Sequence, residues 1–206
     1  ILTVLQSADY PHLLQLRTDP EVMRCVSGFG QPLGAGKVQT KEQVQEHVRL
    51  TQEYYDNHGL GFFCAWEIRS QDFLGQAGLF HHSFDITQPL IELAYRLHRR
   101  YWSKGYATEC ANALIQWGLT VKKIPEIIAP IHPGNERSIR VLEKTPMSYS
   151  GTIQHKGHYL PYYSIKQGEN GRKEHSSTSL GTSISLRARN SRKVVGTRNC
   201  GACSLV

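Results

Sequence analysis

The segment from residue 93 to residue 109 constrains this chain most, because a short basic loop there joins a strand-like run to a helix start. Its sequence is Leu-Ala-Tyr-Arg-Leu-His-Arg-Arg-Tyr-Trp-Ser-Lys-Gly-Tyr-Ala-Thr-Glu. The first N–H groups of a helix have no partner inside it, and the helix dipole adds partial positive charge at the same end. Arg99, Arg100 and Lys104 add cationic side chains, and Gly105 allows close approach of the backbone. The segment therefore predicts a binding site for a phosphate group.

The hydrophobic pattern elsewhere alternates between helix and strand signals without a βαβ repeat. We expect strands at 62–68, 73–80, 90–97, 127–131, 147–153 and 158–165, and helices at 7–17, 40–57, 105–120 and 135–144. Short connections among the first three strands favour an antiparallel meander. The helix after the basic loop is expected to direct Ala107, Ala111, Leu114 and Val121 toward the core. This mixed order indicates an α+β fold.

Charge is distributed unevenly between two parts of the chain. Residues 1–167 carry 17 Lys/Arg and 15 Asp/Glu, whereas residues 168–206 carry 7 Lys/Arg and 2 Asp/Glu. The second part has no aromatic residue and is rich in Ser, Thr, Gly, Arg and Asn, so it cannot bury enough apolar surface to offset its ordering entropy. We therefore expect one folded domain at 1–167 and a basic, disordered tail at 168–206, with an RNA-binding arm as the alternative for the tail.

Composition also limits the surroundings and partners of the chain. No apolar run approaches the length that a bilayer crossing needs, which predicts no membrane partner. Five cysteines, an odd number, do not suggest a disulfide framework, so a cytoplasmic location is expected. We expect no metal, because adjacent His81 and His82 face opposite sides of a strand and Cys200 with Cys203 lacks a partner pair. A homodimer is one of the oligomeric states open to the chain.

Two short motifs follow each other along the chain, with a helix and a strand between them. The first is Trp102-Ser-Lys-Gly-Tyr-Ala-Thr-Glu109, and the second is the helix start Asn135-Glu-Arg-Ser138. Together they resemble the pyrophosphate loop and the Asn-x-x-Ser helix of the GNAT acetyltransferases, nearest to the branch that includes the ribosomal-protein N-acetyltransferases. The resemblance covers most of residues 8–166. It implies a mixed, mostly antiparallel central sheet with helices on both faces and a V-shaped split between the strands at 90–97 and 127–131.

The same resemblance implies an N-acetyltransferase that moves an acetyl group from acetyl-CoA to a primary amine by direct attack in a ternary complex. The acceptor would be a protein N-terminus or a small-molecule amine. A backbone N–H near Ala94 or Tyr95 would stabilise the oxyanion. Ser138 would protonate the departing thiolate, because Leu142 stands where many members of the family have a tyrosine. The implied contacts with acetyl-CoA come from Ala94, Tyr95, Leu97, Arg99, Ser103, Lys104, Gly105, Tyr106, Ala107, Thr108, Asn135 and Ser138.

The group that accepts the proton of the amine is left open. Glu92 would take that proton through water or would orient a cationic substrate, while His155 and His158 lie near the acceptor end and titrate in a suitable range. The acceptor pocket is expected to be lined by Phe29, Phe63, Glu92 and His158.

Two departures from the family pattern keep other functions open. Ser103 stands where this branch usually has glycine, and Thr145-Pro146 replaces the usual Leu-Gly at a helix end. The second hypothesis is therefore a non-catalytic acyl-CoA-binding domain. The third is a nucleic-acid-associated protein that acts through its basic tail.

Overall fold

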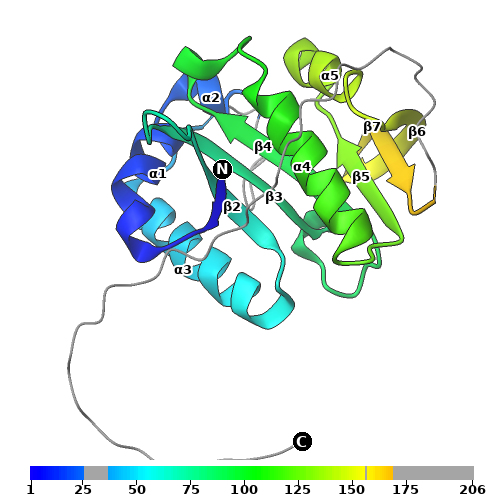
Figure 1. Ribbon diagram of the computed structural model, residues 1–206, viewed down its shortest axis with the longest axis horizontal. Coiled ribbons are helices and arrows are strands. Elements are labelled where there is room, and N and C mark those ends of the chain that lie inside the picture. The colour runs from blue at the N-terminus through cyan, green and yellow to red at the C-terminus, as the bar shows by residue number, and fades with distance from the viewer. Residues whose placement is uncertain (26–36, 156, 169–206) are drawn as a thin grey trace, which may run out of the picture.

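The computed structural model describes residues 1–25, 37–155 and 157–168. In this part of the chain a seven-stranded sheet has the order β1-β2-β3-β4-β5-β7-β6 (Figure 1). Its neighbouring strands are antiparallel except for the parallel pair β4–β5. The strands are β1 (Leu2–Val4), β2 (Gly61–Trp66), β3 (Phe73–His81), β4 (Ile91–Leu97), β5 (Glu126–Pro130), β6 (Ser148–His155) and β7 (His158–Lys166).

Helices cover both faces of this sheet. They are α1 (Tyr10–Arg17), α2 (Pro20–Met23), α3 (Lys41–His58), α4 (Tyr106–Thr120) and α5 (Glu136–Leu142), with 3-10 turns at Ser7–Asp9, His82–Phe84 and Arg99–Tyr101. Figure 1 shows α4 across one face, where it packs on β3, β4 and β5. Helices α1 and α3 pack against each other and against β3 and β2, respectively. Every residue of β2 is buried, as expected for a strand covered on both sides.

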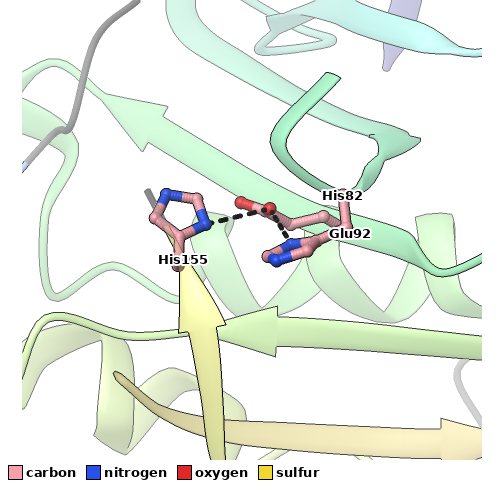
Figure 2. A group of neighbouring side chains, drawn as sticks. All are labelled: His82, Glu92 and His155. Carbon is pink, nitrogen blue, oxygen red and sulfur yellow. Dashed lines mark hydrogen bonds and ion pairs between the residues drawn. The ribbon is translucent and has the colours of Figure 1, made fainter. Parts of the chain in front are cut away.

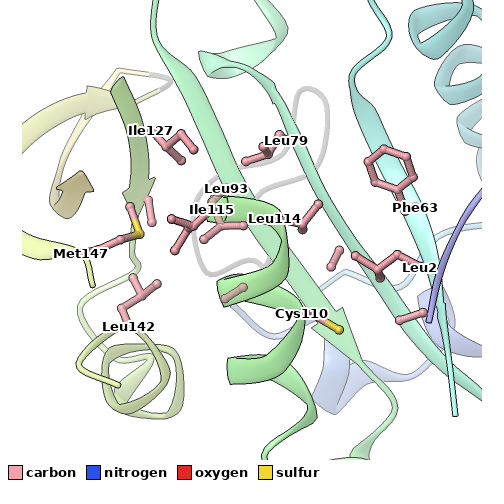
Figure 3. Close-up of a cluster of buried hydrophobic side chains, with 14 of the residues drawn as sticks. Leu2, Phe63, Leu79, Leu93, Cys110, Leu114, Ile115, Ile127, Leu142 and Met147 are labelled. Atoms are coloured by element: carbon pink, nitrogen blue, oxygen red, sulfur yellow. The ribbon is translucent and has the colours of Figure 1, made fainter. Parts of the chain in front are cut away.

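The larger hydrophobic core lies between α4 and the sheet. Leu114 and Ile115 from α4 meet Phe63, Leu79 and Leu93 from three consecutive strands (Figure 3). Cys64 and Cys110 are buried in the core, and neither forms a disulfide. The described helices include none with both the length and the apolar character that crossing a bilayer demands.

The sheet splits between β4 and β5. These strands pair only through Ile91 with Ile127 and Glu92 with Ile128, whereas β4 continues to Leu97 alongside β3. The rest of β4 therefore has no β5 partner on that side. The predicted α+β fold, with a mostly antiparallel sheet, helices on both faces and a V-shaped split, is confirmed.

Two predictions need correction at helix ends. Val121 does not face the core, because α4 ends at Thr120 and leaves that side chain 65% exposed. Helix α5 ends at Leu142 and does not continue to Lys144. Thr145 replaces a glycine cap there: its hydroxyl donates to the Leu142 carbonyl at 2.7 Å and accepts from the Met147 N–H at 3.3 Å.

Candidate active site

A cavity of about 550 Å³ lies between the loop that follows β4 and helix α5. We call it the loop cavity. Most of the residues predicted to contact acetyl-CoA line it, namely Tyr95, Leu97, Ser103, Gly105, Ala107, Thr108, Asn135 and Ser138. Arg99, Lys104 and Tyr106 are not among its lining residues, and Ala94 lines a neighbouring cavity instead. Arg99 and Lys104 are exposed, and the Lys104 ammonium lies 5.6 Å from the centre of the Tyr101 ring.

Left-handed backbone positions shape the turn into α4. Ser103 has φ of 60° and Gly105 has φ of 87°, and Gly105 is the N-cap of α4. Glycine adopts this region freely, but the serine is strained there by about 1 kcal/mol. The turn leaves the first N–H groups of a 15-residue helix facing the loop cavity. Such a helix start favours an anionic ligand.

Cationic side chains surround the same cavity. Arg137, Arg140 and Lys144 from α5 and the residues after it line the wall opposite the turn. The Arg137 guanidinium lies 4.6 Å above the Trp102 ring, so the turn and α5 meet through a cation–π contact. This wall is suited to a polyphosphate.

A second cavity of about 140 Å³ lies at the split in the sheet, and we call it the split cavity. Its walls include Phe62, Phe80 and Phe84, with the last two rings stacked at 4.3 Å. Glu92, Ala94 and Arg96 from alternate positions of β4 also line it, as does His155 from β6.

The two cavities share a wall at the split. Tyr95, Arg96, Asn135, Ser138 and Cys25 line both of them. The Asn135 side chain accepts a hydrogen bond from the Ser138 N–H at 3.2 Å, which begins α5 and fixes Ser138 at this wall. A ligand in the loop cavity and a ligand in the split cavity would therefore meet beside Tyr95 and Ser138.

Strand alternation determines which backbone donor of β4 faces the split. The His98 N–H donates to the Leu74 carbonyl, and the His82 N–H donates to the Leu90 carbonyl, so even-numbered positions of β4 bond toward β3. Odd-numbered positions therefore point toward β5. Because β5 has diverged beyond Glu92, the Tyr95 N–H points into the split, whereas Ala94 bonds toward β3.

His82, Glu92 and His155 form a buried cluster beside the split cavity (Figure 2). The Glu92 Oε2 atom lies 2.9 Å from Nδ1 of His82 and 3.8 Å from Nδ1 of His155. His82 Nε2 lies 3.1 Å from the Gln154 carbonyl oxygen, which only accepts hydrogen bonds, so this nitrogen carries a hydrogen. A hydrogen bond between His82 Nδ1 and the Glu92 carboxyl group then requires one further proton, which the two groups share. In Figure 2 the second ring nitrogen of His155 faces away from Glu92.

The same cluster has the two-histidine, one-carboxylate donor set that binds divalent metal ions. The sequence expectation of no metal rested on adjacent histidines and on a cysteine pair, and it did not consider that His82 would meet His155 from β6. The 2.9 Å between His82 Nδ1 and Glu92 Oε2 is the length of a direct hydrogen bond. A shared proton therefore explains this contact, and no metal ion is needed to explain it.

Two residues that were expected to line the acceptor pocket do not line the split cavity. Phe63 does not line the split cavity: it is 1% exposed and packs edge-on against Trp117 of α4, while its neighbour Phe62 faces the cavity. His158 is exposed and is not a lining residue, whereas His155 is. Phe29 lies outside the described residues, as does the predicted tail beyond residue 168.

Comparison with known families and proteins agrees with this geometry. A family model described as an acetyltransferase (GNAT) domain matches residues 1–148. An uncharacterised protein of Bacillus subtilis, YkkB, is 35% identical over 139 residues, which span 68% of this chain and 75% of that protein. An uncharacterised N-acetyltransferase of Bacillus licheniformis, p20, is 32% identical over 152 residues, 73% of this chain and 78% of that protein.

Solved structures share the fold at lower identity. A GNAT-family acetyltransferase from Bacillus anthracis aligns with a TM-score of 0.65 and 23% identity, covering 82% of this chain and 95% of that one. The ribosomal-protein-S5-alanine acetyltransferase of Vibrio fischeri aligns with a TM-score of 0.64 and 15% identity, covering 82% of this chain and 93% of that one. An aminoglycoside acetyltransferase solved with coenzyme A aligns with a TM-score of 0.65 and 15% identity, covering 81% of this chain and 94% of that one.

Proposed function

Because this chain belongs to the GNAT acetyltransferase family, we propose that it transfers an acetyl group from acetyl-CoA to a primary amine. The observation that carries this proposal is the shared wall between the loop cavity and the split cavity. The loop cavity has a helix start and cationic side chains that suit a polyphosphate, and the split cavity is lined by aromatic and carboxylate groups. The two cavities join where the Tyr95 N–H faces the split. Direct transfer between two bound ligands needs such a junction.

The loop cavity is the acetyl-CoA side of this proposal. The helix start after Gly105 and the cations Arg137, Arg140 and Lys144 would hold the phosphates. The aminoglycoside acetyltransferase with the same fold was solved with coenzyme A, which supports this assignment. Asn135 and Ser138 would then lie beside the pantetheine arm, as the family resemblance implies.

Acetyl-CoA supplies the thioester that the amine attacks in this reaction. The Tyr95 N–H would stabilise negative charge on the carbonyl oxygen, because it points into the split without a β5 partner strand. Ser138 lines both cavities and would protonate the departing thiolate.

The amine must lose a proton before or during attack, and the buried cluster provides acceptors. His155 lines the split cavity and has Nδ1 directed at Glu92, so Glu92 would stabilise the charge that His155 gains. Glu92 itself shares a proton with His82, which holds its carboxylate in place. We assign proton transfer to His155 and Glu92, with His82 as a positioning residue.

A binding titration and a transfer assay test this function on the full chain. Acetyl-CoA and dephospho-CoA are titrated by calorimetry, and a panel of primary amines is then assayed for release of the CoA thiol. Micromolar binding that weakens for dephospho-CoA and amine-dependent thiol release support the proposal. Binding without release by any amine identifies a non-catalytic acyl-CoA-binding domain. Absence of binding removes the proposal altogether.

A further inference from the structure

Arg96 has an unusual environment for an arginine in a sheet. Its guanidinium lies 5.3 Å above the Phe62 ring, and Nη1 lies 4.0 Å from the Met23 sulfur. Neither partner carries charge, and among the described residues no carboxylate oxygen lies within ion-pair distance of it. Burial lowers the pKa of Arg96 to about 10, although the side chain stays partly exposed where it lines both cavities. A charge removed from water without a counterion is costly to a fold.

Two neighbouring side chains, Arg17 and His47, do not balance the charge of Arg96. Arg17 is 3% exposed and donates to the Gln39 and Gln76 side-chain oxygens, which are neutral. The pKa of His47 is lowered well below its ordinary value, first by burial and then by Arg17 and Arg96, so its imidazole is neutral and adds no charge of either sign.

The guanidinium of Arg96 and the carboxyl group of Glu92 share one face of β4. They are four positions apart and point to the same side of the strand, with the small Ala94 between them. At about 3.3 Å per residue their Cα atoms are roughly 13 Å apart, and the Tyr95 N–H lies within this span. The Arg96 guanidinium lies over Phe62, which is level with Ala94 in the sheet, so the Arg96 side chain is directed back toward Glu92 and shortens the span. The floor of the split cavity therefore has the His82–Glu92 pair at one end, the small Ala94 in the middle and the cationic Arg96 at the other.

We propose that the acceptor is a small amino acid-like molecule, whose amine lies at the Glu92 end of the split cavity and whose carboxylate pairs with Arg96. Bidentate pairing with a carboxylate is the interaction that a guanidinium makes best. The rings of Phe62, Phe80 and Phe84 would contact an aromatic or branched side chain. Arg96 would repel a second amine, which disfavours polyamines as acceptors. This inference rests on the proposed acetyl transfer.

The test compares each acceptor with the same molecule lacking its carboxylate. The full-length protein with acetyl-CoA is assayed on aromatic and branched amino acids, each beside its decarboxylated amine, for example phenylalanine beside phenethylamine, with spermidine included. For the preferred pair we expect kcat/KM to be about 100-fold higher for the amino acid than for its decarboxylated amine, because a close charge pair stabilises a complex by about this factor. Arg96→Met should lower kcat/KM for the amino acid to the level of the amine while changing the amine less than about threefold. Arg96→Lys should retain part of the preference because it keeps the charge.

Controls separate binding from folding. Arg49→Met replaces an exposed arginine on α3 and should leave both rates unchanged. Thermal unfolding of Arg96→Met should show no loss of stability, because the variant removes a charge that has no counterion. Acetylation of amines with no preference for any amino acid overturns this inference and leaves the proposed function standing. An equal loss for both members of a pair in Arg96→Met also overturns it. Failure to bind acetyl-CoA overturns both.

Discussion

The Tyr95 phenol on β4 donates a hydrogen bond to the Ser138 carbonyl on α5, with 3.3 Å between the two oxygens. This contact joins the two walls of the split at the point where the loop cavity and the split cavity meet. Burial raises the pKa of the Tyr95 hydroxyl, so it remains a donor throughout the physiological range. The position of α5, and with it the Ser138 side chain, depends partly on this bond.

Tyr95→Phe should therefore weaken acetyl-CoA binding without unfolding the protein. Loss of one neutral hydrogen bond of about 1 kcal/mol predicts a roughly fivefold higher Kd. Calorimetric titration of the full chain with acetyl-CoA measures it. Tyr162→Phe is the matched control, because Tyr162 is a partly buried tyrosine on β7 that lines neither cavity. Equal affinity for wild type and Tyr95→Phe would mean that α5 is held by its other contacts.

Ser138→Ala tests the proposed thiolate protonation. Removal of a general acid typically lowers the rate about 100-fold, and here kcat should fall while the Kd for acetyl-CoA stays within about twofold. The backbone N–H of residue 138 still donates to Asn135 in the variant, so α5 keeps its cap. Ser148→Ala, at the exposed start of β6, should have no effect. Unchanged turnover in Ser138→Ala would remove this hydroxyl from the mechanism.

Ser103→Gly should stabilise the protein. Ser103 has φ of 60°, and a non-glycine residue pays about 1 kcal/mol in this region. Glycine adopts the same backbone freely but also gains freedom in the unfolded chain, so the net increase in the free energy of unfolding should be about 0.5 kcal/mol. Urea unfolding measures the change. A decrease would show that the serine side chain stabilises the loop by more than its strain costs.

Local signals in the sequence predicted the parts of the site that adjoin helix starts. The glycine before α4 and the Asn135 cap of α5 each leave a signature within a few residues, and both lie where that signature puts them. Strand sidedness was harder to predict. All residues of β2 are buried, so its pattern does not alternate, and Phe63 was mistaken for Phe62 as a cavity residue.

Long-range contacts left no local signal at all. His82 and Glu92 meet His155 only because β7 folds back between β5 and β6 and brings the end of β6 to the split. The sequence also could not predict that Arg96 lacks a carboxylate partner, because that depends on which side chains pack around it in the fold. Sequence could suggest Glu92 and His155 singly, and the fold brings them together.

His47 on α3 should make stability depend on pH below neutrality. Its side chain is 6% exposed and lies 3.5 Å from both the Thr51 hydroxyl and the Gln76 amide nitrogen. Burial, then the charges of Arg17 and Arg96, hold the pKa of His47 well below 6.5 in the folded state. The unfolded chain has the ordinary histidine pKa of about 6.5. Between these two values the unfolded state binds the extra proton.

Stability should therefore be independent of His47 above about pH 7 and should fall as pH drops below about 6.5, by up to about 1.4 kcal/mol per pH unit from this group. His47→Gln keeps a polar side chain but cannot titrate, so its free energy of unfolding should decline less steeply between about pH 6.5 and pH 5. Urea unfolding at several pH values measures both slopes. His158→Gln, at an exposed histidine, should retain the wild-type slope. Parallel slopes for wild type and His47→Gln would show that His47 becomes protonated without unfolding the protein, contrary to its burial beside two arginines.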